Sequence, residues 1–253
     1  MADKLTERQE IEKEYHDKKY KDDLVSTSHS GESSSYIFFH GLVGEVKGLR
    51  VLDYGCGTGW VGLGLARSGA EVYGIDISKE LIKKALQYAE RENLSNKVSF
   101  QEMPAENLTF PDTFFDLIVG SAILHHLDIS IALKGISRVL KPGGRALFIE
   151  PMNQNIVLKI WRKLTPWRRS PTERALDEGD LKLIRGIFPE SKFYFFTFFS
   201  IVSEGLLVLS PSNKLLLLMN GFMEGLDKML LKAFPALGKY SAVVVMDLQK
   251  GKK

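Results

Sequence analysis

The chain has 253 residues, which is long enough for one domain with a buried core and an attached cap. Its 44% hydrophobic and 26% charged residues are ordinary for a soluble globular protein. The formal net charge of +3 is too small to indicate a nucleic-acid-binding protein. The single cysteine, Cys56, excludes an internal disulfide and a metal site built from several cysteines, and no metal is expected. The charged start lacks the apolar segment of a secretion signal, so we expect a cytoplasmic protein.

Residues 1–23 are almost all charged and predict a surface helix, and a serine-rich flexible segment follows at 26–35. Two interpretations of the helix stay open. It could fold over a ligand site and bring the ring of Tyr15, His16 or Tyr20 close to a cationic group. It could equally be a solvated, charged helix.

From residue 49 onward, short apolar runs alternate with helical segments, which predicts a parallel sheet with right-handed helical crossovers. The expected strands are 50–54, 71–75, 98–101, 115–119 and 145–150. The expected helices are 60–68, 79–93 and 130–140. Gly69 can end the first helix and Ser78 can cap the second.

The alternation weakens after the fifth expected strand. A helix is expected at 180–188, and β-rich segments at 192–202 and 240–248 could pair as antiparallel strands that finish the sheet. Between these segments, Ser210 and Pro211 predict the start of a helix that runs to residue 232 with an apolar face. The apolar positions on this face are Leu215, Leu218, Met219, Phe222, Leu226, Met229 and Leu230.

Two segments near the C-terminus bear on membranes. The most apolar one, 193–209, is interrupted by Glu204 and falls short of the roughly 20 apolar residues of a membrane-spanning helix. The other is a basic cluster that could contact anionic lipid headgroups or an acidic substrate group, although a solvated face is the favoured interpretation. The cluster consists of Lys159, Arg162, Lys163, Arg168, Arg169 and Arg174, with Trp161 and Trp167 among them.

The segment VLDYGCGTG at 51–59 runs from a strand directly into three alternating glycines. Glycine permits positive φ and lets a ligand approach the backbone, and the following helix offers free N–H groups. Residues 57–62 also fit the dinucleotide pattern G-x-G-x-x-G. However, Asp53 stands at the strand end itself, where a carboxylate would attract a cationic group and repel a pyrophosphate.

Asp76 ends the apolar run EVYGID, roughly 20 residues beyond the glycines, where a carboxylate can accept hydrogen bonds from both hydroxyls of a ribose. The alternative is that Asp76 only helps to cap the helix that begins near Ser78. The acid predicts nucleoside binding without identifying the ligand.

Two further motifs follow. FDLIVGSAILHHL at 115–127 is a strand that opens into a loop with two histidines, and LKPGG at 140–144 predicts a helix end and a tight turn. In this order and spacing, the four motifs resemble the class I S-adenosylmethionine-dependent methyltransferases, particularly the small-molecule branch that includes the ubiquinone and menaquinone methyltransferases. The resemblance covers residues 45–151. It implies a doubly wound α/β fold, the Rossmann-like methyltransferase fold, with a seven-stranded, mostly parallel sheet, an antiparallel last strand and a helical cap inserted near the C-terminus.

The resemblance also implies S-adenosylmethionine as the cofactor. Asp76 would bind its ribose, Ile77 would pack on the adenine, and Ser121 would line the sulfonium side. Cys56 is expected to be a small filler of the glycine loop and not a reactive thiol. The residues implied around the methionine part are Asp53, Gly55, Gly57 and Gly59.

The sequence departs from the family at one point. Relatives often carry Asp-Ala-Glu after the third strand, with the aspartate reaching the adenine, whereas here the run is Met103-Pro104-Ala105-Glu106. Backbone groups of Met103 and Ala105, or the carboxylate of Glu102, are expected to hold the adenine instead.

Methyl transfer needs alignment and the exclusion of water, and it needs a base only when the acceptor carries an acidic proton. His125 and His126 are the candidate bases, because their loop follows the fourth strand at the active-site edge and histidine titrates near neutral pH. The favoured alternative is structural: His126 packs against the cofactor or holds the loop by hydrogen bonds.

Four segments are therefore expected: a charged helix and flexible segment at 1–35, a cofactor-binding core at 36–151, a helical cap containing the sixth strand at 152–239, and a closing strand with a basic tail at 240–253. The cap would form a mobile roof whose apolar lining selects the acceptor, with ordinary core packing as the alternative.

The expected function is methylation of a small lipophilic or aromatic molecule, such as a quinone, a polyketide-like product or a lipid. A peripheral contact with membrane or lipid is left open. One alternative is methylation of a polar metabolite or a protein, with the apolar face serving a dimer. Another is a non-catalytic S-adenosylmethionine-binding subunit, against which the intact glycine loop argues. A nicotinamide-dependent oxidoreductase is a more distant alternative, because Asp53 and the LKPGG run disfavour it.

Overall fold

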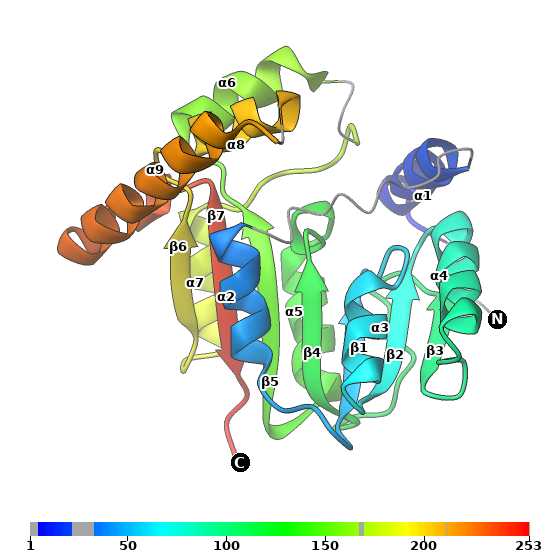
Figure 1. Cartoon of the computed structure of the whole chain (residues 1–253). Helices are drawn as coiled ribbons and strands as arrows, with labels where there is room; N and C mark the ends of the chain where they lie inside the picture. Colours follow the sequence, from blue (N-terminus) through cyan, green and yellow to red (C-terminus); the bar gives the residue numbers. More distant parts are fainter. Residues whose placement is uncertain (1–4, 22–32, 167–169, 211, 253) are drawn as a thin grey trace.

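The structure is a computed structural model that describes residues 5–21, 33–166, 170–210 and 212–252. Its centre is a seven-stranded sheet with the order β3-β2-β1-β4-β5-β7-β6 (Figure 1). The strands from β3 to β5 are parallel, and β7 runs antiparallel to both β5 and β6, which confirms the expected fold. The strands are β1 (Arg50–Tyr54), β2 (Glu71–Asp76), β3 (Val98–Glu102), β4 (Phe115–Ser121), β5 (Leu140–Pro151), β6 (Lys192–Phe196) and β7 (Val243–Gln249).

Helices cover both faces of the sheet, so the central strands are apolar on both sides. Phe39 of α2, Ala66 of α3 and Ala85 of α4 belong to the core of one face. Ile136 of α5 and Ile184 of α7 belong to the core of the other. The helices of the two faces are α2 (Ser34–Val43), α3 (Trp60–Arg67), α4 (Lys79–Arg91), α5 (Ile129–Val139) and α7 (Glu178–Ile187).

The remaining helices lie at the carboxyl edge of the sheet (Figure 1). One is α1 (Glu7–Tyr20), which packs near α4. The cap is formed by α6 (Ile156–Leu164), α8 (Ile201–Leu209) and α9 (Lys214–Ala233). The described residues also form two short 3-10 helices, η1 (Leu124–His126) and η3 (Pro235–Tyr240). The sequence patterns had not indicated α2, α6 or α8.

The expected ends of two helices are confirmed. The Ser78 side chain accepts a hydrogen bond from the Leu81 N–H and caps α4. Gly69 follows the end of α3 with a φ of +93°, the left-handed conformation that favours glycine after a helix.

The LKPGG run differs from its prediction. The helix α5 does end at Val139, but residues 140–144 belong to β5 instead of a separate turn. The register of β5 against β4 is irregular between Phe115 and Leu117. The Gly143 N–H donates to the carbonyls of Lys250 and Gly251. The turn expected from Pro-Gly-Gly is therefore a bulged beginning of the strand.

The strand expected at 192–202 is wrong in its second half. It ends at Phe196, and a helix begins at Ile201. The carboxylate of Asp227 accepts hydrogen bonds from the N–H groups of Phe198, Phe199 and Ser200, which turns the chain away from the sheet. A tertiary contact thus overrides the local preference of an aromatic run for a strand.

The start of the last cap helix is also corrected. Its N-cap is Asn213 and not Ser210. The Asn213 side chain accepts hydrogen bonds from the N–H groups of Leu215 and Leu216. Pro211 lies outside the described residues, as do Trp167, Arg168 and Arg169 of the basic cluster and residues 26–32 of the serine-rich segment. Among the residues that are described, no helix combines the length and apolar character that a membrane crossing needs.

Candidate active site

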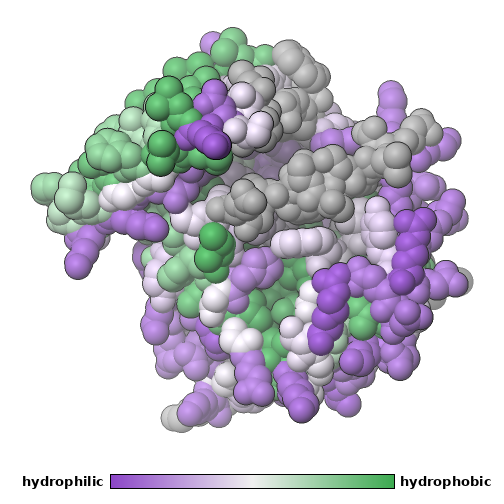
Figure 2. Space-filling view, in the orientation of Figure 1, coloured by the Kyte–Doolittle hydropathy of each residue, from purple (hydrophilic) through white to green (hydrophobic). Residues whose placement is uncertain are grey.

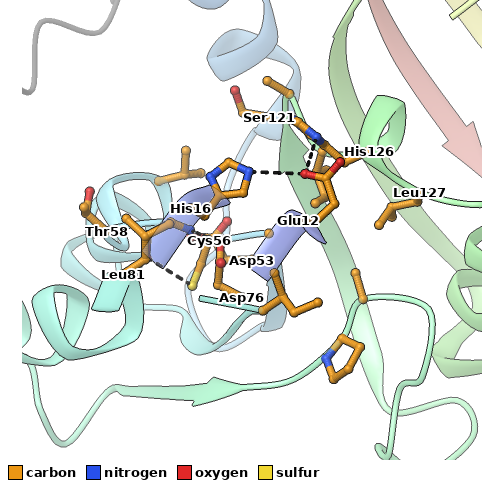
Figure 3. A pocket seen from close by; sticks show the side chains of 18 of the residues that line it. Glu12, His16, Asp53, Cys56, Thr58, Asp76, Leu81, Ser121, His126 and Leu127 are labelled. Atoms are coloured by element: carbon orange, nitrogen blue, oxygen red, sulfur yellow. Dashed lines mark hydrogen bonds and ion pairs between the residues drawn. The ribbon is translucent and has the colours of Figure 1, made fainter. Parts of the chain in front are cut away.

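A cavity of about 310 Å³ lies at the carboxyl ends of β1, β2 and β4, the edge where ligands bind in open α/β sheets. Its size is at the lower end of small-molecule sites. Side chains from α1 lie above it, as Figure 3 shows for Glu12 and His16.

The glycine loop forms one wall. Gly55, Gly57 and Gly59 all have positive φ, at +73°, +53° and +79°. A Cβ at Gly55 would lie 2.6 Å from Ile123, and one at Gly59 would lie 2.7 Å from Phe100, whereas a Cβ at Gly57 would meet nothing within 4 Å. Gly57 therefore faces the cavity, and any side chain there would occupy the space that a ligand needs.

Two carboxylates stand beside this loop, that of Asp53 buried and that of Asp76 partly buried. Asp53 accepts a hydrogen bond from the Gly62 N–H at 2.8 Å, and Asp76 accepts from Gly57 and Ser78, each at 2.9 Å. In the described part of the chain, these hydrogen bonds come only from backbone N–H groups. Burial raises the pKa of Asp53 to about 7, and the nearby Asp76 adds to the effect. Burial also raises the pKa of Asp76, against the two backbone N–H groups.

Acidic groups outnumber cations in the lining. Besides Asp53 and Asp76, the carboxylates of Glu12 and Glu106 line the cavity. Glu106 forms an ion pair with Arg8, and Glu12 is paired with His126 and His16. Among the described residues, the hydrogen bonds to Asp53 and Asp76 come from backbone N–H groups, and such carboxylates favour a ligand that carries positive charge. S-adenosylmethionine, with its sulfonium and ammonium groups, fits this donor and acceptor set, and the space in front of Gly57 suits its close approach.

The structure brings together most of the residues expected around the cofactor. Those that line the cavity are Asp53, Gly55, Cys56, Gly57, Asp76, Ile77, Pro104, Ala105 and Ser121. Gly59 and Met103 do not line it: Gly59 packs against Phe100, and the Met103 N–H donates to the Asp76 carbonyl. Burial raises the pKa of the Cys56 thiol well above its usual value, in keeping with an unreactive filler.

Neighbouring side chains hold the backbone and side chains of the region expected to bind adenine. The Tyr54 hydroxyl donates to the Ala105 carbonyl at 2.6 Å, which leaves that carbonyl engaged. Glu102 forms an ion pair with Lys13 of α1. Pro104 and Ala105 still line the cavity, so they offer apolar surface to an adenine ring.

His125 lies outside the cavity lining. Its Nδ1 lies 2.8 Å from the Glu150 carboxylate, which also accepts from the N–H groups of Ile123 and Leu124. Both His125 and Glu150 are buried. This placement gives His125 a structural part, holding the loop after β4, and we do not propose it as a base.

His126 lines the cavity and is oriented by α1. Its Nδ1 lies 3.1 Å from Glu12 Oε2, and the Nε2 of His16 lies 3.6 Å from the same oxygen (Figure 3). Ser170 and Thr172 donate to the other oxygen of Glu12. Burial opposes the ionisation of Glu12, but the hydrogen bonds from His126, His16, Ser170 and Thr172 outweigh it and hold the pKa of Glu12 well below its usual value.

The roof of the cavity is α1. Arg8, Glu12, His16 and Tyr20 recur every four residues, so they share one face of the helix, and all four line the cavity. The helix is attached by polar contacts, among them the Asp17 carboxylate, which accepts from the Ser78 hydroxyl at 2.6 Å. Two interpretations of the charged N-terminal helix were open, and in the structure the helix folds over the cavity. The four-residue spacing of titratable side chains was the signal in the sequence.

The cap does not form the expected roof. Among the described residues of 152–239, none lines the cavity. The described part of the segment contacts the site through Ser170 and Thr172 at Glu12 and through Glu173, whose carboxylate lies 4.0 Å from His126 Nε2. Phe222, expected inside the roof, is 66% exposed. The apolar side chains Leu215, Leu218 and Met229 of α9 are exposed as well.

The strand order, the glycine loop after β1 and the acid at the end of β2 define the Rossmann-like fold of the class I methyltransferases. Residues 52–148 match the family described as a methyltransferase domain. The chain thus carries a methyltransferase domain and resembles the class I S-adenosylmethionine-dependent methyltransferases.

Particular relatives resemble this domain and not the whole chain. The uncharacterized methyltransferase YcgJ of Bacillus subtilis is 38% identical over 102 residues, which are 40% of each chain. A ubiquinone biosynthesis O-methyltransferase of Coxiella burnetii is 38% identical over 111 residues, which are 44% of this chain and 46% of the relative. The matches thus span less than half the length of these relatives.

A solved structure extends the likeness in fold to almost the whole chain. The geranyl diphosphate C-methyltransferase of Streptomyces coelicolor superimposes with a TM-score of 0.68 over 99% of this chain and 100% of its own, at 13% identity. At that identity the likeness concerns the fold alone.

Proposed function

We propose that the chain is an S-adenosylmethionine-dependent methyltransferase that acts on a small lipophilic or aromatic acceptor by direct methyl displacement. The observation that carries the proposal is the open space in front of Gly57, flanked by the buried carboxylate of Asp53 and the partly buried carboxylate of Asp76. Bound S-adenosylmethionine would supply an electrophilic methyl group. The chain's residues would hold it in line with the acceptor and exclude water.

The two carboxylates take different parts of the cofactor. Asp76 lies at the end of β2 with both oxygens held by backbone N–H groups, so its remaining acceptor capacity can serve the two ribose hydroxyls. Asp53 lies deeper and bonds to the first turn of α3 through Gly62, which suits the ammonium of the methionine part.

The acceptor side of the cavity supports an apolar substrate. Apolar side chains from several elements line part of it, and one relative is, by its name, a ubiquinone biosynthesis O-methyltransferase, which favours a lipophilic acceptor. The apolar lining residues are Trp60, Val61, Leu81, Ile123 and Leu127.

We assign His126 as the general base for an acceptor with an acidic proton. With Nδ1–H donating to Glu12, the lone pair of His126 is on Nε2, and this atom takes the acceptor proton as the acceptor's electron pair forms the new bond to the methyl carbon. The Glu12 carboxylate then stabilises the resulting imidazolium, as the acid of a catalytic triad does.

The first experiment tests the cofactor. Isothermal titration calorimetry with S-adenosylhomocysteine should show binding and with NAD should show none. Tight NAD binding without a response to S-adenosylhomocysteine would overturn the assignment. The acceptor is then sought by comparing metabolites with and without the protein. Cofactor binding without any methylated product would favour a non-catalytic subunit.

The second experiment tests the base. His126→Asn should lower kcat by about 10²–10⁴-fold with little change in S-adenosylhomocysteine affinity. His40→Asn, which changes a histidine outside the cavity, is the control. Among related phenolic acceptors, the loss should shrink as the acceptor becomes more acidic. Equal loss across such a series would assign His126 to packing. Because Glu12, His16 and His126 offer ligand atoms within 4.8 Å of one another, each assay is repeated with EDTA, and inhibition would assign the cluster to a metal ion instead.

A further inference from the structure

The cap helices α6, α8 and α9 leave their apolar side chains largely uncovered. In the described chain, α6 has no buried residue, and the only buried residue of α9 is an acid, Asp227. Asp227 binds the N–H groups that begin α8, so polar contacts fix α9 to α8. Amphipathic helices in a globular domain normally turn their apolar side to the core.

The exposed apolar residues follow helical spacing. Leu215, Leu218, Phe222 and Met229 lie three, four and seven residues apart, on one side of α9, and are 74%, 74%, 66% and 65% exposed. On α6, the exposed residues Ile156, Ile160 and Leu164 recur every four residues. Figure 2 shows hydrophobic residues gathered over these helices. We call this surface the cap face; it also includes Val157, Trp161, Val202, Leu206 and Leu217.

The charges beside the cap face have one sign. The exposed charged side chains of α6 and α9 are all lysines, whereas Asp227 is buried and Glu224 is partly buried and accepts from Asn220. Lys214 precedes Leu218 by one turn, and Lys232 follows Met229 by one turn, so both flank the apolar stripe. The exposed lysines are Lys159, Lys163, Lys214, Lys228 and Lys232.

We propose that the cap face binds the surface of an anionic phospholipid membrane. The apolar stripes would enter the boundary between headgroups and acyl chains, and the lysines would contact lipid phosphates. A contiguous apolar surface of this kind marks an interaction site, unlike singly scattered residues. A second copy fits less well, because a two-fold interface would bring lysines of both copies together.

The position of the cap gives the contact a consequence for the cavity. The cap lies at the carboxyl edge of the sheet, the same edge as the cavity (Figure 1). Docking would therefore turn this edge toward the membrane, from which a lipophilic acceptor could reach the site. This consequence rests on the proposed function, whereas membrane binding itself does not.

The test is flotation of the full chain with vesicles of phosphatidylcholine, with or without phosphatidylglycerol. Binding should require phosphatidylglycerol and weaken at high salt. Leu218→Asp and Phe222→Asp should each weaken binding by about tenfold or more, since burying a Leu or Phe side chain contributes about 1.5–3 kcal/mol. Lys214→Glu should weaken it by at least about fivefold, the equivalent of roughly 1 kcal/mol per lysine.

The chain offers matched controls. Ile131 is 50% exposed on α5, away from the cap, and Lys134 is exposed on the same helix. Ile131→Asp and Lys134→Glu should bind vesicles as the unaltered chain does. Every variant should show the same rise in melting temperature with S-adenosylhomocysteine, which separates loss of docking from loss of the fold or of the proposed function.

Three outcomes would overturn the proposal. The first is a chain that stays unbound with both kinds of vesicle. The second is a Leu218→Asp variant that floats as well as the controls. The third is a dimer in sedimentation velocity that Leu218→Asp converts to a monomer while vesicle binding is absent, which would assign the cap face to a second copy.

Discussion

The proposed placement of the cofactor ammonium at Asp53 predicts that the affinity for the cofactor depends on pH. The pKa of Asp53 lies near 7 in the free protein, because burial and the neighbouring Asp76 carboxylate disfavour the charged form. A ligand ammonium beside Asp53 favours the charged form, so below pH 7 binding must first displace a proton. Each pH unit then costs about 1.4 kcal/mol. S-adenosylhomocysteine should bind roughly tenfold more weakly at pH 6 than at pH 8.

Calorimetry at several pH values measures this slope, and Asp53→Asn is the variant that should remove it. A second readout is the stability of the free protein. The native pKa of Asp53 is raised from 3.8 to about 7, so the native state holds a proton that the unfolded state has released, and stability should fall as pH rises through that window. Asp53→Asn should flatten this decline. An affinity that does not change between pH 8 and 6, or the same slope in Asp53→Asn, would refute the placement of the ammonium at Asp53.

Three further predictions concern single positions. Asp76→Ala should weaken S-adenosylhomocysteine binding, since it removes two charge-assisted hydrogen bonds of roughly 1.5–3 kcal/mol each. Asp76→Asn should lose less affinity. An unchanged dissociation constant in an intact fold would contradict the ribose assignment. Gly57→Ala should reduce affinity more than Gly48→Ala, because both have positive φ and open space at the Cβ position but only Gly57 faces the cavity; equal affinities would show that the Gly57 space is not used. Burial, with the Glu224 carboxylate, raises the pKa of Glu204 from 4.5 to about 7. The free energy of unfolding should therefore fall as pH rises through that window. Glu204→Gln should raise it by roughly 3 kcal/mol at most at pH 8 and not at pH 4, which a higher melting temperature at pH 8 alone would show. No difference at pH 8 would contradict the burial of that charge.

The sheet could be predicted from the sequence because its signals are local. The five parallel strands were expected within a residue or two at most ends, since each is a short apolar run between turn residues. The largest difference is the beginning of β5, which lies at Leu140 instead of residue 145. Its cause is non-local, because the Gly143 N–H donates to the carbonyls of Lys250 and Gly251. The aromatic run 192–202 failed in the same way, because Asp227 lies 25 or more residues further along the chain.

The cofactor side of the cavity was equally predictable, whereas the acceptor side was not. Gly55, Gly57, Asp53 and Asp76 stand at strand ends, and the ends of neighbouring parallel strands meet at one edge of the sheet. Glu12 reaches His126 because α1 crosses that edge. The four-residue spacing of Arg8, Glu12, His16 and Tyr20 indicates that they share one face of the helix, but not which part of the fold that face contacts. The helix is polar, so hydrogen bonds and ion pairs position it, and the sequence pattern carries no apolar stripe from which to predict a partner.

This division has a consequence for where acceptor specificity is encoded. The methyltransferase-domain match spans residues 52–148, which include the glycine loop, Asp76 and His126. Several groups facing the remaining space lie outside that span: Arg8, Glu12 and His16 on α1, and Tyr36 on α2, whose hydroxyl lies 2.6 Å from the Ser121 hydroxyl. Glu12 is in turn fixed by Ser170 and Thr172, which follow the cap helix α6. The segments that carry these groups therefore lie outside the matched domain, and identity within that domain cannot by itself transfer a relative's substrate to this chain.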